Sequence, residues 1–455
     1  MIILGTNSVK DTGYDVANSC RFNSNSSDYL NRTLGTPTNN KKYTVSAWLK
    51  KSKIGGNNLN NNAQSLFGTA DISGGATYFE INTSNQLFFG EYSSSAWQIE
   101  IKTNRVLRDL SAFYHIVLAV DTTQSTSSNR VKLYVNGSQE TSLAQTNYPN
   151  QNFNTLLNSA NVHFISNNGN SASESYAGYF DGYYSEFSLI DGQALDPTSF
   201  GEFDDSGIWK PIDGLADDLT FGNNGFYLDF KNSGALGADV SGNSNNFTVN
   251  NLTAIDQSTD TCTNNATVWS ALTPRSSDIT LSEGNLNVTM GGTSRGIFAT
   301  IAASSGKWYY ESKWVSGSYF QTGVIATDTM NDNDDVYGGK TGGFMYAQSG
   351  KIRSGGSDLA SVSSLSTGDI VGVALDMDND LLYFYKNGAV QNSGTGIDIS
   401  AYSEYTFGCA PTSAVLSANF GSPSFAISSG NQDPNGYGNF EYSTNGYYAL
   451  NTKNL

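Results

Sequence analysis

FYHIVLAVD at residues 113–121 and, after a polar loop, RVKLYVNG at residues 130–137 form the clearest structural signal in this chain. Apolar and polar side chains alternate over residues 131–135, which is the period of a half-buried strand. Residues 116–120 are apolar at every position and predict a central strand with both faces buried. Asn136-Gly137 favours the positive φ angles of a type I′ turn. The segment therefore predicts a β-hairpin with an Asn-Gly exit turn.

The same layout occurs a second time, in GDIVGVALD at residues 368–376 and LLYFYKNG at residues 381–388. Two such hairpins, far apart in a chain of 455 residues, indicate two β-sheet domains. Helix formers are scarce, whereas 47 glycines and many Val, Ile, Thr, Tyr and Phe residues are typical of an all-β protein. We therefore predict an all-β fold with two β-sandwich domains in series.

The charge balance restricts the partners. The formal net charge is −17, which argues against nucleic acid, because its binding needs clustered Lys and Arg. An anionic membrane surface is disfavoured for the same reason, although an acidic balance can also serve solubility alone. No stretch approaches the roughly 20 apolar residues of a membrane span, so we expect no membrane insertion.

The cysteines and the N-terminus carry little functional signal. Cys20, Cys262 and Cys409 are widely spaced, which supports neither a zinc site nor a redox motif. We predict that they are buried free thiols. The apolar run at residues 2–4 is too short for the core of a signal peptide, so we expect no export by the general secretory route.

The first two hundred residues resemble a known jelly roll. The alternating strand at residues 43–49, the hairpin at residues 113–137, and FDGYYSEF at residues 180–187 with LDPTSF at residues 195–200 occur in that order. This order resembles the laminin-G-like, concanavalin A-type jelly roll. The resemblance implies a sandwich whose loops or faces bind sugars and whose rim can hold calcium.

A second resemblance covers the other half. GKWYYE at residues 306–311, the hairpin at residues 368–388 and NFG at residues 419–421 occur in the order and spacing of the SPRY domain. The resemblance implies a bent β-sandwich that binds partners through its edge loops.

These two resemblances set the expected domain borders. We place the jelly roll at residues 1–205 and the SPRY-like domain at residues 274–425, followed by a C-terminal tail at residues 426–455. Residues 206–273 are expected to form a connecting segment. The segment contains a strand at residues 226–230, which we expect to pack on a neighbouring domain, the first sandwich in preference.

The order of both domains also resembles a group of phage proteins. CRFN at residues 20–23, DGQAL at residues 191–195, SGN at residues 241–243 and the run at residues 446–455 resemble the paired laminin-G-like and SPRY proteins of marine bacteriophages. This resemblance implies synthesis in the host cytoplasm and a place in the virion, on the tail or capsid surface. It also implies other virion proteins as partners and a homo-oligomer of a copy number that the sequence does not give.

Catalytic patterns are weak. Glucanases of the jelly-roll fold carry Glu-x-Asp-x-x-Glu on one strand, and the nearest approach here is Glu202-Phe203-Asp204 in a turn, without a third Glu. Of the two histidines, His115 lies inside a predicted core strand. With no activated Ser or Cys beside a His, a hydrolase triad is not supported. We therefore expect a protein that is not an enzyme.

Clustered oxygen ligands make calcium the one candidate cofactor. Asp332 and Asp334 lie in an Asn- and Asp-rich loop, and Asp121 ends a predicted strand of the first domain. Each of these residues also suits an ordinary turn. We keep Asp121, Asp332 and Asp334 as metal-ligand candidates.

Sugar binding is the better-supported chemistry. An aromatic ring stacks on the C–H face of a sugar, while amides bond to its hydroxyls. Trp97, beside three serines at residues 93–95, fits such a platform, with core packing as the alternative. Loop candidates in the second half are Asp332, Asp335, Tyr337, Arg353 and Tyr402.

The sequence thus leaves three functions open. The first is a non-enzymatic virion protein, a tail-fibre or adhesin component that binds host surface carbohydrate. The second is a structural decoration or assembly protein of the phage capsid or tail. The third is a glycan hydrolase on the jelly-roll fold.

Overall fold

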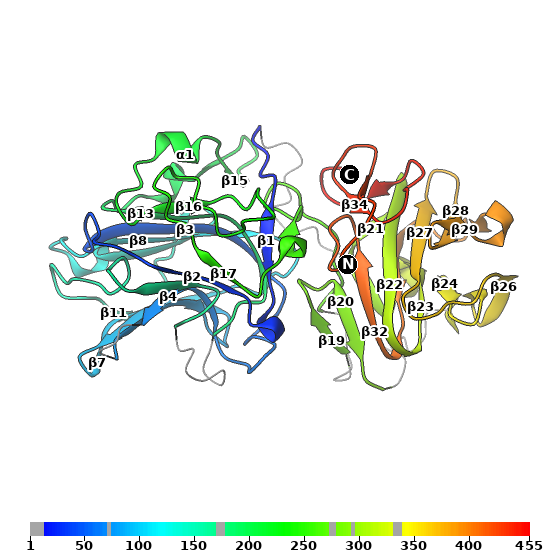
Figure 1. Cartoon of the computed structure of the whole chain (residues 1–455), viewed down its shortest axis with the longest axis horizontal. Coiled ribbons are helices and arrows are strands. Elements are labelled where there is room, and N and C mark those ends of the chain that lie inside the picture. Colours follow the sequence, from blue (N-terminus) through cyan, green and yellow to red (C-terminus); the bar gives the residue numbers. More distant parts are fainter. Residues whose placement is uncertain (1–12, 71–73, 170–177, 273–278, 293–295, 331–338) are drawn as a thin grey trace. The chain divides into compact units, whose positions relative to one another are not determined.

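The computed structural model describes residues 13–70, 74–169, 178–272, 279–292, 296–330 and 339–455 (Figure 1). It is nearly all-β and divides into two compact units at Asn264 and Asn265. The predicted fold class is therefore confirmed. Cys20, Cys262 and Cys409 are buried and free, as predicted. None of the helices in the described ranges has the length and apolar character needed to cross a bilayer.

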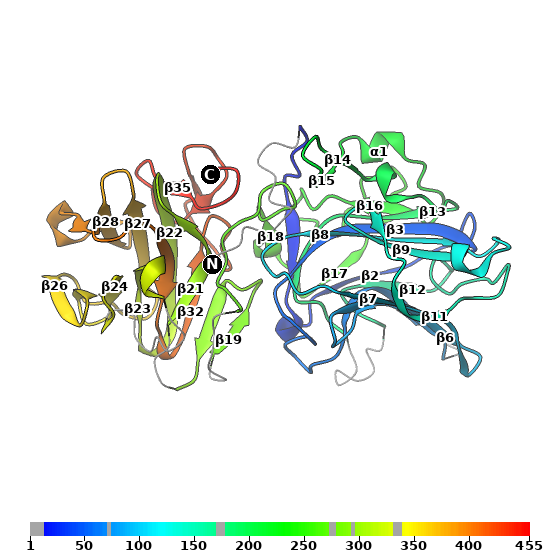
Figure 2. The same cartoon turned by 180° about the vertical axis from the view of Figure 1, so that it is seen from behind.

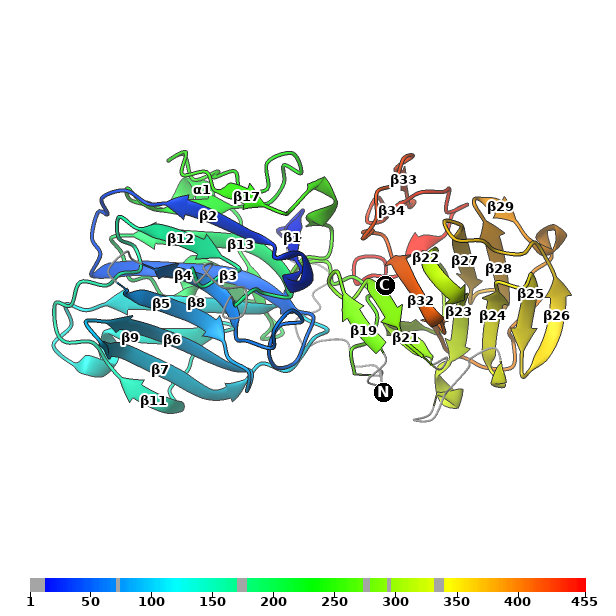
Figure 3. The same ribbon diagram turned by 60° about the horizontal axis from the view of Figure 1, so that its bottom comes forward.

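The first unit, which ends at Asn264, has two main antiparallel sheets (Figure 2). Sheet A follows the order β10 (Ser138–Gln139), β9 (Val131–Val135), β8 (Tyr114–Asp121), β3 (Lys42–Lys51), β13 (Gly182–Asp191), β1 (Ser19–Phe22) and β18 (Gln257–Ser258). Sheet B follows the order β11 (Leu143–Asn147), β7 (Ala96–Val106), β6 (Gln86–Ser93), β5 (Ala76–Ile81), β4 (Gln64–Ala70), β12 (Val162–Ile165), β2 (Tyr29–Thr33) and β17 (Thr248–Asn250) (Figure 3).

The main core of this unit combines side chains from both sheets. Val45 and Leu118 of sheet A belong to one buried cluster with Phe67, Phe79 and Ile101 of sheet B. The cluster forms because alternate residues of each strand point to the same face. The opposite face of sheet B therefore carries the other set of side chains, which includes Trp97.

The predicted hairpin of residues 113–137 is confirmed as β8 and β9, which pair in antiparallel register. Its exit turn has φ angles of 48° at Asn136 and 77° at Gly137, the left-handed conformation that an Asn-Gly turn favours. Both faces of β8 are buried along most of its length. The second face is buried because another layer of chain covers sheet A.

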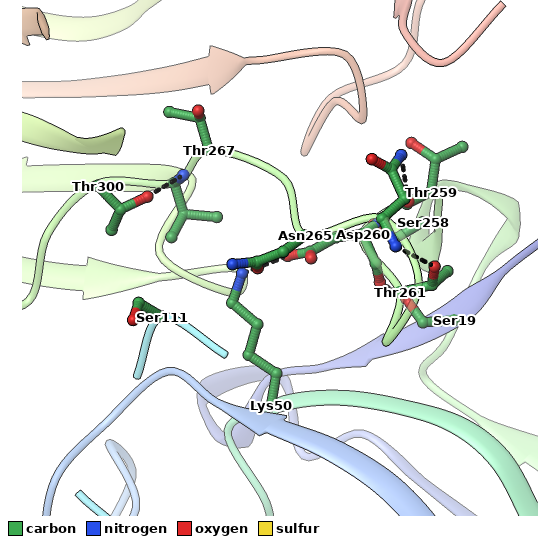
Figure 4. A network of polar contacts seen from close by, with 12 residues as sticks. Ser19, Lys50, Ser111, Ser258, Thr259, Asp260, Thr261, Asn265, Thr267 and Thr300 are labelled. Atoms are coloured by element: carbon green, nitrogen blue, oxygen red, sulfur yellow. Dashed lines mark hydrogen bonds and ion pairs between the residues drawn. The ribbon is translucent and has the colours of Figure 1, made fainter. Parts of the chain in front are cut away.

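This covering layer comes mainly from residues after β13. It includes β14 (Gly201–Phe203), β15 (Trp209–Pro211) and the short helix α1 (Leu215–Asp218), which β16 (Phe226–Leu228) follows in the chain. Strand β16 pairs with β13, so the strand expected in the connecting segment belongs to sheet A. Lys50 of β3 and Asp260 form a buried ion pair in the layer, with 2.9 Å between Nζ and Oδ2 (Figure 4).

The second unit also contains two main sheets. Sheet G follows the order β19 (Ile279–Ser282), β20 (Asn287–Met290), β32 (Thr412–Asn419), β22 (Lys307–Tyr319), β27 (Ile370–Asp376), β28 (Leu381–Lys386) and β29 (Ala389–Val390), with β30 (Ile397–Asp398) on β28. Sheet H follows the order β21 (Ile297–Ala303), β31 (Tyr405–Cys409), β23 (Gln321–Ala326), β24 (Gly343–Ala347), β25 (Lys351–Ser354) and β26 (Ser357–Ser361). Tyr310 and Val373 of sheet G share a buried cluster with Val324 and Phe407 of sheet H.

The C-terminal segment covers the other face of sheet G. It contains β33 (Asn431–Gln432), β34 (Asn439–Phe440) and β35 (Tyr448–Ala449), and β35 pairs in parallel with β22. Phe440 and Ala449 share a buried cluster with Tyr309 and Ala374 of the sheet. Residues 426–455 are thus an integral layer of the second unit.

Candidate functional site

The described surface of sheet B carries a cluster of four aromatic side chains, Trp97 and three that surround it. The ring of Trp97 lies 5.8 Å from that of Tyr78, 5.9 Å from that of Phe88 and 5.5 Å from that of Tyr92, measured between centroids. Trp97 is 40% exposed and Tyr92 36% exposed. Trp97 therefore lies on the surface and not in the core. We call these four residues the Trp97 cluster.

Gly90 makes this cluster possible. It lies on β6 between Phe88 and Tyr92, and a Cβ atom at this position would lie 2.5 Å from Phe88 Cζ and 2.9 Å from Trp97 Cζ3. Both rings therefore lie down over the bare backbone of β6. A β-bulge between Glu91 and Tyr92 brings Tyr92 opposite Trp97 on β7.

Side-chain amides lie beside the cluster. Asn147 Nδ2 donates a hydrogen bond to the carbonyl oxygen of Trp97 at 3.1 Å, and Gln98 Nε2 donates to that of Ser93 at 3.1 Å. In both bonds the amide NH2 group is the donor. The carbonyl oxygen of each amide can accept a further hydrogen bond. Ser94 and Ser95, in the turn between β6 and β7, are exposed. The site thus combines an apolar ring surface with amide and hydroxyl groups.

The ionisable side chains on this part of sheet B are mostly acidic. Glu80 occupies the position opposite Phe88, and Glu100 the position opposite Gly90. Burial raises the pKa of Glu80 to about 7. Glu100 Oε1 accepts a hydrogen bond from Gln145 Nε2 at 2.7 Å, and Lys102 lies two residues further along β7. The surface around Trp97 therefore offers no net positive charge to an anionic ligand.

The covered face of sheet A carries a second polar group, centred on His115 of β8. The His115 ring stacks on Trp48 with 4.7 Å between centroids and on Trp209 with 5.8 Å. Trp209 Nε1 can only donate, so His115 Nδ1 accepts its hydrogen bond at 3.0 Å, and Nε2 carries the proton shared with Ser46 Oγ. Burial lowers the pKa of His115 to about 3. This fully buried, neutral imidazole serves packing.

Glu186 of sheet A is the most unusual ionisable residue beneath the same layer. It lies in a bulge of β13 with a φ angle of 50°, a left-handed conformation that is rare for residues other than glycine. Its Oε2 atom accepts hydrogen bonds from the hydroxyls of Tyr227 and Tyr14. Its Oε1 atom is buried without a hydrogen-bond partner. Burial raises the pKa of Glu186 to about 7.

Glu186→Gln should make the stability of the first unit less dependent on pH. Between pH 4.5, the ordinary pKa of Glu, and about 7, the unfolded chain loses a proton that folded Glu186 keeps, so the parent protein loses stability as the pH rises. A glutamine keeps the acceptor oxygen but does not titrate. We expect the variant to gain on the order of 2 to 3 kcal/mol over the parent between pH 4.5 and 8, measured by urea unfolding. An equal difference at every pH would contradict this account.

The metal-ligand candidates are not brought together in the part of the chain that the structure describes. Asp121 Oδ1 accepts hydrogen bonds from Thr123 and Oδ2 from Gln124, and Oδ2 lies 3.3 Å from Lys42 Nζ. Asp121 therefore caps the turn after β8. Asp332 and Asp334 lie outside the described residues. Among the residues that are described, no three His, Cys, Asp or Glu side chains group as a metal site would require.

The ligand candidates of the second unit are scattered. Arg353 on β25 pairs with Asp358 on β26, with 3.0 Å between Nε and Oδ1. Tyr402 packs partly buried against the core, edge-on to Tyr405 at 6.2 Å. Asp335 and Tyr337 lie outside the described residues. For Arg353 and Tyr402 the observed contacts are those of scaffold residues.

The carboxylates considered for hydrolysis are engaged in a turn. Asp204 Oδ1 accepts hydrogen bonds from the backbone N–H groups of Ser206 and Ile208. Glu202 forms an exposed ion pair with Lys210, with 3.1 Å between Oε1 and Nζ. Through these contacts Asp204 and Glu202 stabilise the β14–β15 hairpin.

Comparison with known proteins agrees with both folds. Residues 23–198 match the family model of the concanavalin A-like lectin/glucanases superfamily, and residues 307–412 match the SPRY domain model. The chain is thus a nearly all-β protein with a concanavalin A-like domain followed by a SPRY domain. The SPRY domain of human HERC1 is a similar solved structure, at 16% identity and a TM-score of 0.26, covering 31% of this chain and 91% of that one. No curated protein matches the chain.

Sequence reasoning singled out Trp97 but not its neighbours. Tyr78, Phe88, Tyr92 and Gly90 were missed, although a signal was present. Tyr78, Phe88 and Gly90 lie on the outward face of two adjacent strands. On that face of β6 the glycine stands between two aromatic residues. A glycine between two outward aromatic residues indicates a ring that lies over the backbone.

Proposed function

We propose that this chain is a non-enzymatic carbohydrate-binding protein whose first unit holds sugar at the Trp97 cluster. The supporting observation is the exposure of Trp97 among three further aromatic rings, with Gly90 beneath and amides beside it. Aromatic surfaces bind the apolar C–H face of a sugar, and amides pair with its hydroxyl groups. The match to a superfamily of lectins and glucanases supports the same chemistry.

The proposed setting is the surface of a phage particle, as part of a tail fibre or adhesin that contacts host surface carbohydrate. It is supported by the sequence resemblance to phage proteins that pair the same two domains. The second candidate is a decoration or assembly protein of the capsid or tail. Locating the chain in an intact particle separates the two, because a fully enclosed position is incompatible with host recognition.

Trp97→Ala should weaken polysaccharide binding by a factor of about 30 or more, because removal of a central aromatic contact costs about 2 kcal/mol. Gly90→Ala should also weaken binding. The added methyl group would displace the rings of Phe88 and Trp97 while every aromatic side chain is retained. Affinity electrophoresis in gels that contain host surface polysaccharide measures both effects.

Phe203→Ala is the matched control for these variants. Phe203 is a 54% exposed aromatic residue of the same unit, packed edge-on against Trp209 and not part of the Trp97 cluster. We expect this variant to bind like the parent. Equal binding by the parent and Trp97→Ala would exclude the proposed site, and no binding by the parent at about 1 mM glycan would exclude the function. Release of reducing ends from host polysaccharide would favour the hydrolase alternative.

A further inference from the structure

The turn beside Trp97 is built from unfavourable residues. Ser94 and Ser95 have φ angles of 51° and 63°, so both central positions of the β6–β7 hairpin are left-handed. Glycine and asparagine adopt this conformation more readily than serine. The chain uses that solution elsewhere, at Asn136-Gly137 and Asn387-Gly388, whose φ angles are 48°, 77°, 47° and 79°. Two serines in this turn therefore cost stability that Asn-Gly would not.

Their position gives a reason for that cost. Both serines are exposed, and Trp97 follows Ser95 by two residues. The register pairs Ser93 with Ala96 and Tyr92 with Trp97, so the turn begins at the edge of the Trp97 cluster. Strained backbone conformations cluster at binding sites, and the strain at Ser94 and Ser95 lies beside an exposed aromatic cluster. A serine hydroxyl can both donate and accept a hydrogen bond, as the hydroxyls of a sugar require.

The shape of the cluster favours a single sugar ring over an extended flat surface. The ring planes of Tyr78, Phe88 and Tyr92 are inclined to that of Trp97 by 53°, 81° and 76°. A crystalline polysaccharide face would need several coplanar rings. Inclined rings around one indole instead suit one pyranose that contacts several side chains.

The charges favour a neutral ligand. Glu100 lies opposite Gly90 and Lys102 lies opposite Phe88, so these two charges offset each other. Burial raises the pKa of Glu80 to about 7, which favours its neutral form. The site thus presents no net positive charge to pair with a uronate or a sulfated sugar, whose anionic groups would lose hydration on binding without gaining an opposite charge. A neutral hexose carries no such cost.

We infer that Trp97, Ser94 and Ser95 form one subsite for a neutral pyranose residue, with the indole stacked on the sugar ring and the two hydroxyls bonded to sugar hydroxyls. This inference rests on the proposed function, because it names the ligand class and the contact residues of the same site.

The full chain is tested against a neutral β-glucan, a neutral galactan, alginate and a sulfated dextran, at equal ionic strength. We expect binding to a neutral polysaccharide and at least about tenfold weaker binding to both anionic ones. Ser94→Gly/Ser95→Gly removes both hydroxyls and suits positive φ, so it should weaken neutral-glycan binding about tenfold while its unfolding midpoint stays equal or rises. A purely structural turn would show the stability change without the loss of affinity.

Asn392→Gly/Ser393→Gly is the control, because this pair in the second unit has φ angles of 50° and 51° and Ser393 is exposed. It should bind like the parent. Parent-like affinity of the Ser94→Gly/Ser95→Gly variant, or stronger binding to the anionic polysaccharides, would overturn the inference and leave the proposed function intact. Failure of the parent to bind any of the four polysaccharides would overturn both.

Discussion

Phe440→Ala should destabilise the second unit by about 3 to 5 kcal/mol, the usual cost of removing a fully buried phenylalanine ring. Phe440 has no exposed surface and lies 5.1 Å from Tyr309 of β22, edge to face. The ring helps to hold the C-terminal segment on sheet G. Without it, the cluster with Tyr447 and Ala449 is left with a cavity at its centre.

The same segment is also held by polar contacts. Glu311 of β22 accepts hydrogen bonds from the backbone N–H groups of Glu441 at 2.9 Å and Tyr442 at 2.8 Å. Asn419 Nδ2 donates to Glu311 Oε2 at 3.1 Å. Burial raises the pKa of Glu311 to about 7, whereas these hydrogen bonds favour the charged form of its carboxyl group. A segment that shifts after loss of Phe440 also loses them, so the two kinds of contact reinforce each other.

Hydrogen exchange by mass spectrometry reports on each unit separately, which matters because a chain of two units need not unfold in one step. We expect peptides from β22 and β27 to lose protection by about two orders of magnitude or more in Phe440→Ala. Leu359→Ala, at a 46% exposed position of β26 in the same unit, is the control and should exchange like the parent. Equal exchange in both variants would mean that the segment does not stabilise the sheet.

Loss of either member of the Lys50–Asp260 pair should destabilise the first unit by about 3 to 5 kcal/mol, because it removes an ion-pair contact of a charge that stays buried. The side chains of both residues are 2% exposed. Lys50 Nζ also lies 5.9 Å from the centre of the Tyr183 ring. The pair joins β3 to the loop that follows β18 (Figure 4).

A double-mutant cycle measures this coupling. Lys50→Met and Asp260→Asn should each show the full loss in urea unfolding, while the double variant should lose less than the sum of the two. Additive effects would show that the two charges are independent. Lys42→Met is a control, because Lys42 pairs with Asp121 at 3.3 Å while remaining 36% exposed, and exposed pairs contribute at most about 1 kcal/mol.

The fold was predictable where its signals are local. The alternation in residues 131–135 and the Asn-Gly turns are properties of adjacent residues, and the structure contains the corresponding strand and turns. The covering layer was harder to predict. Its strands β14 and β15 pair with each other in a short hairpin, and each spans three residues, too few to show a period.

The candidate site was predictable only in part, for a similar reason. Tyr78 and Phe79 are adjacent, as are Phe88 and Phe89, so each strand has aromatic side chains on both faces. Which ring faces outward depends on the face that the core occupies, and this is a property of the whole sheet. The bulge at Glu186 had no local signal either, since its sequence continues an ordinary strand pattern.

Strand β13 bears on the order in which the first unit forms. It pairs with β1 and β3, from the start of the unit, and with β16, which follows it. The central pairing of sheet A therefore joins residues more than a hundred positions apart in the sequence. Closing such a long loop costs conformational entropy. We therefore expect the first unit to fold slowly. Until β13 pairs with them, β1 and β3 each have an unpaired edge.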